Sequence, residues 1–161
     1  MQGGYIDIYC ERTGPEFWSE PVNALTNLAF IFSALWVARL IRNHAGARID
    51  PALWVLCALI FIIGVGSWLF HTQATRWALL ADIIPIAIFI LVYTWYAMRR
   101  FAEVNAVICG AGVAVVLAVA MAVPPLTGFR GGSYVAALLA MLVIGGYLRI
   151  ARSHPAGSAL L

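Results

Sequence analysis

Long apolar stretches alternate with short polar segments along this chain. Five of the stretches are long enough to cross a bilayer core, which takes roughly 20 helical residues. They cover residues 22–41, 52–71, 77–98, 104–123 and 134–150. Polar or helix-breaking segments separate them, among them 43–50, the arginine pair 99–100 and the proline pair 124–125, which we expect to end the fourth helix. The pattern predicts five transmembrane helices after a polar leader, residues 1–21, all in a single domain, residues 1–161.

The composition indicates a polytopic membrane protein. Apolar residues make up 63% of the 161 residues and charged residues 11%, against about 45–50% and about 25% in soluble domains. The apolar fraction excludes a disordered chain, and three cysteines are too few for a disulfide scaffold. The net charge of +3 is scattered, so we expect no nucleic-acid partner. The predicted fold class is all-α, with no obligatory protein partner evident.

The arginines favour one orientation in the membrane. When alternate loops are counted, seven of the ten basic residues fall on one side: Arg39, Arg42, Arg48, Arg99, Arg100, Arg149 and Arg152. Arg12, Arg76 and Arg130 fall on the other. By the positive-inside rule the first group is cytoplasmic, so the N-terminus lies outside. We expect a multi-pass protein of a bacterial inner membrane.

Three polar residues lie in the second and third stretches, where an ionisable group costs on the order of 2.5–3.5 kcal/mol. Ser67 and His71 are four residues apart and share one helix face. After a short loop, Asp82 lies about 9 Å down the returning helix, so the hairpin brings all three to one depth near the outer side. Each also has a structural explanation: a bond from Ser67 to a carbonyl, an interfacial His71, or capping by Asp82 of an amide freed near Pro85.

An imidazole and a carboxylate at the same depth in the membrane are the groups that a metal ion needs nearby to activate a water molecule. His71 would be a metal ligand, Asp82 the base and Ser67 a donor to a developing oxyanion. A catalytic zinc ion takes about three protein ligands, whereas His44 and His154 fall on the opposite side of the membrane. The chain by itself therefore offers one of the roughly three protein ligands that a catalytic zinc ion needs.

The leader carries four of the seven acidic residues. Its carboxylates, with backbone and hydroxyl oxygens, would supply the shell of six to eight oxygens that Ca²⁺ prefers. The candidate calcium ligands are Asp7, Tyr9, Glu11, Thr13 and Glu20. The alternative is a solvated acidic leader. Asn23 and Asn27, four residues apart at the start of the first stretch, would face one side and tie the leader down.

Two spaced motifs suggest a family. Tyr9-Cys10-Glu11 is followed by EPVNALTNL at residues 20–28, and GSWLFH at residues 66–71 is followed by Asp82, eleven residues after the histidine. Together they resemble the alkaline ceramidases and their bacterial relatives. The serine–histidine–aspartate spacing is also that of the wider superfamily, which includes the adiponectin and progestin receptors.

The resemblance implies seven helices around a zinc ion, held by one histidine of the second helix and an H-x-x-x-H pair of the seventh. His71 matches the first ligand, Asp82 the aspartate that contacts the zinc-bound water, and Ser67 the serine that supports the oxyanion. The chain contains no H-x-x-x-H. We therefore expect five helices of a seven-helix bundle, in a chain truncated at its C-terminal end.

The resemblance also implies a structural calcium site. Glu11 and Glu20 match its acids, and Tyr9 would offer its carbonyl. The aspartate that comes first in the family would fall on Ile8, so Asp7 is displaced by one position. Thr13 stands where asparagine is usual.

We therefore expect a zinc-dependent intramembrane hydrolase that cleaves the amide of ceramide-like lipids into a sphingoid base and a fatty acid. A membrane lipid would reach a site in the outer half of the bilayer laterally. The alternatives are a non-catalytic or receptor-like protein of the same superfamily, an inactive fragment, or a transporter piece with an Asp–His proton relay. The Tyr-Cys-Glu leader favours the ceramidase branch.

Overall fold

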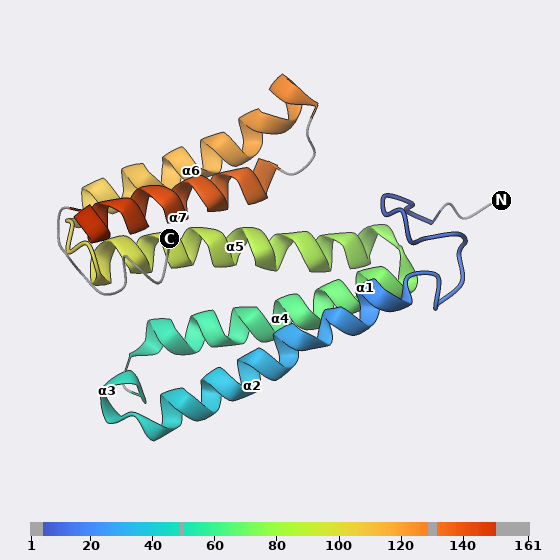
Figure 1. Ribbon diagram of the computed structural model, residues 1–161, viewed down its shortest axis with the longest axis horizontal. Helices are drawn as coiled ribbons and strands as arrows, with labels where there is room; N and C mark the ends of the chain where they lie inside the picture. The colour runs from blue at the N-terminus through green and yellow to red at the C-terminus, as the bar shows by residue number, and fades with distance from the viewer. Residues whose placement is uncertain (1–4, 49, 129–131, 151–161) are drawn as a thin grey trace. The chain divides into compact units, whose positions relative to one another are not determined.

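The computed structural model describes residues 5–48, 50–128 and 132–150, and each regular element in these ranges is a helix (Figure 1). The elements are α1 (Pro21–Thr26), α2 (Leu28–Asn43), α3 (Ala45–Arg48), α4 (Pro51–Gln73), α5 (Arg76–Arg100), α6 (Ala106–Thr127) and α7 (Gly132–Ile150). The chain divides into two compact units, residues 1–89 and 90–161, with the division inside α5. Each unit is described by itself.

Four helical segments are long and apolar enough to cross a membrane. They are Pro21–Asn43, Pro51–Gln73, Arg76–Arg100 and Ala106–Thr127, and Tyr134–Ile150 is a shorter apolar helix. Each of these segments overlaps one of the five predicted stretches, although several bounds differ by a few residues, and the protein is an all-α membrane protein. Its orientation stays a prediction, and Arg130 and Arg152, which enter the arginine count, lie outside the described residues.

The first predicted stretch is divided into α1 and α2 at Asn27. Thr26 Oγ1 donates to the carbonyl oxygens of Val22 and Asn23, at 2.8 and 3.1 Å, and Asn27 Nδ2 donates to the Asn23 carbonyl at 2.8 Å. Hydroxyl and amide side chains of this kind compete with the backbone for its acceptors. Asn27 keeps a right-handed helical backbone and donates its backbone amide to the Asn23 carbonyl, so α1 and α2 together form the single apolar segment Pro21–Asn43.

α6 extends beyond the predicted end of the fourth stretch. The helix continues through Pro124 and Pro125 to Thr127, so the expectation that the proline pair ends it was wrong by about one turn. Gly128 supplies the stop, because it adopts a left-handed conformation with φ of 73° and donates its amide to the Pro124 carbonyl at 2.9 Å. Proline removes a donor but leaves its own carbonyl free to close this last turn.

In the first unit α2 lies beside α4 (Figure 1). Ala34, Ile41 and Cys57 form the buried centre of this contact, and the Cys57 thiol donates to the Ala34 carbonyl at 3.2 Å. A Cβ at Gly64 would meet Ile31 and Phe30 of α2. The missing side chain thus lets the two helices approach closely, which fixes the position of α4 and of the residues near its end.

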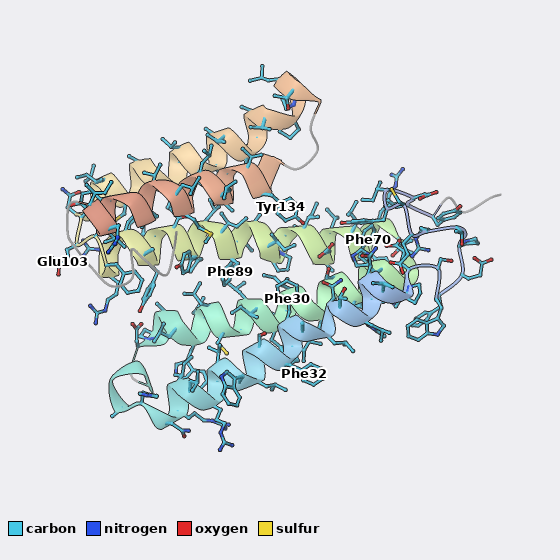
Figure 2. The ribbon with its side chains drawn as sticks, in the orientation of Figure 1. Phe30, Phe32, Phe70, Phe89, Glu103 and Tyr134 are labelled. Atoms are coloured by element: carbon cyan, nitrogen blue, oxygen red, sulfur yellow. The ribbon has the colours of Figure 1, made fainter. Side chains whose placement is uncertain are left out.

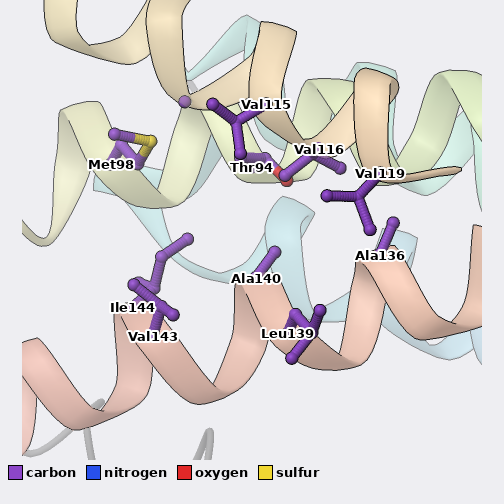
Figure 3. A pocket seen from close by; sticks show the side chains of 11 residues that line it. Thr94, Met98, Val115, Val116, Val119, Ala136, Leu139, Ala140, Val143 and Ile144 are labelled. Carbon is purple, nitrogen blue, oxygen red and sulfur yellow. The ribbon is translucent and has the colours of Figure 1, made fainter. Parts of the chain in front are cut away.

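In the second unit α6 packs against α7. Ala97, Ala102, Ile144 and Leu148 form its buried cluster. A cavity of about 390 Å³ lies between the helices, and its lining is apolar apart from Thr94 (Figure 3). The Thr94 hydroxyl donates to the carbonyl of Ile90 at 2.7 Å. This cavity therefore presents no ionisable group, and the candidate chemistry lies in the first unit.

Candidate functional site

The α4–α5 hairpin brings together the three polar residues singled out in the sequence. Ser67, His71 and Asp82 are 7%, 5% and 5% exposed. A Cβ at Gly66 would collide with the carbonyl oxygen of Ala81, so glycine allows the two backbones to touch one residue before Ser67 and Asp82. The prediction of an antiparallel hairpin that places the three residues at one level is confirmed.

Asp82 has an incompletely paired carboxylate. The Ser67 hydroxyl faces it, and the His71 ring is close enough to interact with it electrostatically. Oxygen Oδ1 is buried and has no hydrogen-bond partner among the described residues. Because a buried polar atom without a partner is costly, such an atom usually has a ligand, a water or an ion as its partner.

His71 is held through one ring nitrogen. Its Nδ1 lies 2.5 Å from Oε2 of Glu20, and the Tyr9 ring packs edge-on against the imidazole, with the ring centroids 4.8 Å apart. Phe70 lies at the leader end of α4 (Figure 2). Its ring is also edge-on to that of Tyr9, with the centroids 6.2 Å apart. The imidazole is therefore fixed by one hydrogen bond and by an aromatic neighbour.

The charge state of Glu20 sets the tautomer of His71. Burial raises the pKa of the Glu20 carboxyl, but hydrogen bonds from His71, Arg12 and Asn23 outweigh burial and hold the pKa below its usual value. The ionised carboxylate only accepts hydrogen bonds, so His71 Nδ1 carries the proton. In the neutral imidazole, Nε2 is then left with a free lone pair.

Arg12 is buried in a cage of oxygen atoms. Its Nε donates to Glu20 Oε1 at 2.5 Å, Nη1 donates to the Gly14 carbonyl at 3.0 Å, and Nη2 donates to the His71 carbonyl at 2.8 Å. Its side chain has no exposed surface. The bonds to Glu20 and Gly14 lie within the leader, whereas the bond to the His71 carbonyl attaches the leader to the end of α4. The Ile6 amide adds a bond to the Ala74 carbonyl at 2.7 Å.

The predicted calcium ligands occupy different surroundings. Glu11 accepts the amides of Val22 and Asn23, at 2.7 and 3.0 Å, and so caps the start of α1. Asp7 and Thr13 are exposed. Glu20 lies in the network with Arg12 and His71, where Asn23 Nδ2 also donates to it at 3.2 Å. Asn23 therefore contacts the leader as expected, whereas Asn27 bonds to the Asn23 carbonyl within its own helix.

The donors of the site fit part of a zinc centre. His71 Nε2 and the unpaired Asp82 oxygen are the types of atom that bind zinc or its water. No group of three or more His, Cys, Asp or Glu side chains within residues 5–48, 50–128 and 132–150 is arranged to hold a metal ion. The described residues thus provide one imidazole of such a centre.

A family model described as Ceramidase matches residues 9–156. The chain belongs to the ceramidase family. The matched range includes the leader from Tyr9 onward and all three residues of the α4–α5 site, and membership supports a ceramide-related hydrolase. No curated protein and no solved structure matches this ceramidase-family chain.

Sequence reasoning missed two contacts of this site. It assigned Arg12 only to the arginine count, and it did not anticipate that Glu20 reaches His71. One signal was present: Arg12 is the single basic residue in a leader with four acids. A lone arginine in an acidic segment is a natural partner for a carboxylate that becomes buried.

Proposed function

We propose that this protein is a zinc-dependent intramembrane amide hydrolase acting on ceramide-like lipids, with its reacting centre at Ser67, His71 and Asp82. The observation that carries the proposal is the buried Oδ1 of Asp82, which has no hydrogen-bond partner in the described part of the chain and lies next to a serine hydroxyl and an oriented imidazole. Family membership supplies the substrate class.

Each residue has a distinct role in this proposal. When bound, a zinc ion supplies Lewis acidity and lowers the pKa of a water toward neutrality. His71 would hold the zinc ion through Nε2. Glu20 accepts a hydrogen bond from Nδ1 and so fixes the ring, as a carboxylate commonly does for the second nitrogen of a metal-binding histidine. Asp82 accepts a proton from the attacking water as general base. The Ser67 hydroxyl donates a hydrogen bond to the oxyanion that develops from the amide carbonyl.

An apolar groove near the site supports a lipid substrate. It has a volume of about 200 Å³ and is lined by residues of α4 and α5: Phe61, Ile62, Val65, Gly66, Leu69 and Ala81. Gly66 and Ala81 are the sequence neighbours of Ser67 and Asp82. An acyl chain in this groove would place its amide close to the reacting residues.

The proposal is tested by amide hydrolysis with the purified protein in detergent micelles. We expect fatty-acid release from a long-chain ceramide, loss of release on treatment with a zinc chelator, and recovery on addition of zinc. Asp82→Asn keeps the size of the side chain but removes the base, so the rate should fall by about a hundredfold or more.

Asp50→Asn is the matched control. Asp50 accepts the Ala52 amide at 2.9 Å as the N-cap of α4, and asparagine caps a helix equally well. This variant should retain the wild-type rate. Equal rates for Asp82→Asn and wild type, or hydrolysis that does not respond to metal removal, would contradict the proposal.

A further inference from the structure

The leader of this chain folds around a buried positive charge. The Arg12 guanidinium is enclosed by Glu20 and by the carbonyl oxygens of Gly14 and His71, each within 3.0 Å of a donor nitrogen. Two of these acceptors belong to the leader and one to α4. A cation in this position therefore joins two segments that are 59 residues apart in the sequence.

The same carboxylate that neutralises Arg12 also orients His71. Oxygen Oε1 of Glu20 accepts from Arg12 and Oε2 accepts from His71 Nδ1. Removal of one partner of a buried ion pair leaves the other charge uncompensated, which is strongly destabilising. Without Arg12, Glu20 Oε1 would lose its buried donor, so the carboxylate would turn toward water and away from His71 Nδ1.

The arrangement differs from the calcium shell expected for the leader. Ca²⁺ takes six to eight oxygen ligands. Both oxygens of Glu11 accept backbone amides of α1, and both oxygens of Glu20 accept from Arg12 and His71. The carboxylates thus have protein donors, and the centre of the oxygen cage is occupied by a guanidinium.

We propose that Arg12 is a positioning residue: its guanidinium serves as the internal cation that docks the leader on α4 and holds Glu20 against His71. Leader docking is therefore independent of a divalent cation. The effect of Arg12 on catalysis rests on the proposed function, whereas docking and the orientation of His71 do not.

The test measures hydrogen–deuterium exchange of the leader amides and the ¹⁵N NMR signals of the His71 ring, with the whole protein in detergent micelles. In the wild type, leader exchange should be the same with calcium and with a calcium chelator. Arg12→Met should speed leader exchange by about a hundredfold or more, and should shift the His71 ring from the Nδ1–H form toward a mixture of tautomers. Arg12→Lys keeps the charge and should restore much of both signals.

Arg76→Met is the matched control, because Arg76 is an exposed arginine at the start of α5. It should leave leader exchange and the His71 signals unchanged. Exchange of the amides in the α2–α4 contact provides the folding control, and it should be equal in every variant.

Two results would overturn the proposal. One is loss of leader protection in the wild type on chelation, since a divalent cation would then hold the leader. The other is an Arg12→Met protein whose leader exchange and His71 tautomer match the wild type. If both readouts behave as expected but the protein hydrolyses no ceramide, the proposed function fails and the role of Arg12 stands.

Discussion

Buried polar residues of the first unit, in a chain that is 63% apolar, cluster at the leader end of α4. Arg12 and Glu20 compensate each other's charge, and Glu20 also accepts from His71. By contrast, Thr72 donates to carbonyls of its own helix, as polar residues in apolar helices commonly do. Asp82 differs from these residues because one of its oxygens has no protein partner in the part of the chain that is described.

Ser67→Ala tests whether the serine acts in the reaction. We expect kcat for ceramide hydrolysis to fall by about a hundredfold, the range found for loss of an oxyanion donor, with KM and thermal stability nearly unchanged. Ser19→Ala is the control, because Ser19 is equally buried and its hydroxyl donates to the Glu16 carboxylate at 3.1 Å. A Ser67→Ala protein as active as Ser19→Ala would assign the hydroxyl a structural role only.

Small residues and helix ends determine the position of α4. Gly64 allows contact with α2, and Gly66 allows contact with α5. α4 begins at the Asp50 N-cap with Pro51 in its first turn, and it ends where Ala74 adopts a left-handed conformation with φ of 48°. Since an L-residue rarely adopts this conformation, the leader bond from Ile6 to the Ala74 carbonyl contributes to holding it.

Gly66→Ala should disrupt the hairpin that carries the site. The added Cβ would collide with the Ala81 carbonyl oxygen, which is backbone and cannot move without shifting α5. We expect a loss of stability of about 1–3 kcal/mol and a large loss of hydrolysis, measured by thermal unfolding and by fatty-acid release in micelles.

Gly146→Ala serves as the control for Gly66→Ala. Gly146 lies within α7, and nothing lies within 4 Å of its added Cβ. Because alanine is the better helix former by about 1 kcal/mol, this variant should be as stable as the wild type or more stable. If Gly66→Ala behaves in the same way, close contact between α4 and α5 is not required.

Four long apolar segments and a shorter one account for most of the chain. The arginine distribution predicts that the leader lies outside the membrane. The leader and the α4–α5 site are in direct contact through His71. If the leader is outside, Ser67, His71 and Asp82 are therefore also near the outer surface.

The native cysteines allow the orientation to be tested. Cys10 is exposed in the leader, whereas Cys57 and Cys109 are buried. A membrane-impermeant maleimide added to intact spheroplasts should therefore label the wild type. A protein carrying Cys10→Ser and His44→Cys, with the new thiol at the exposed end of α2, should be labelled only after the membrane is opened. The reverse pattern would show that the arginine count gives the wrong orientation.

The membrane helices and the grouping of Ser67, His71 and Asp82 could be predicted from the amino-acid sequence. The positions of the membrane spans follow from the apolar content and the length of each stretch. Both are local properties of the sequence, because a helix that crosses the bilayer must be apolar and long enough to span its core. The proximity of Ser67, His71 and Asp82 also has a local cause. Ser67 and His71 share a helix face because they are four residues apart, and the short connection to the next helix forces an antiparallel hairpin that brings Asp82 back to the same level. The motifs around these residues led to the same family that the comparison identified.

The contacts between the leader and the α4–α5 site depend on long-range packing and could not be predicted in this way. Glu20 and His71 are 51 residues apart, and Arg12 and the His71 carbonyl 59, so no helical or strand period links them. An acidic leader can remain solvated, bind a cation or bury an arginine. The outcome depends on which hydrogen-bond donors reach its carboxylates once the chain has folded. The end of α6 at Gly128, by contrast, has a local cause, because the Pro124 carbonyl accepts the hydrogen bond from the Gly128 amide that closes the last turn.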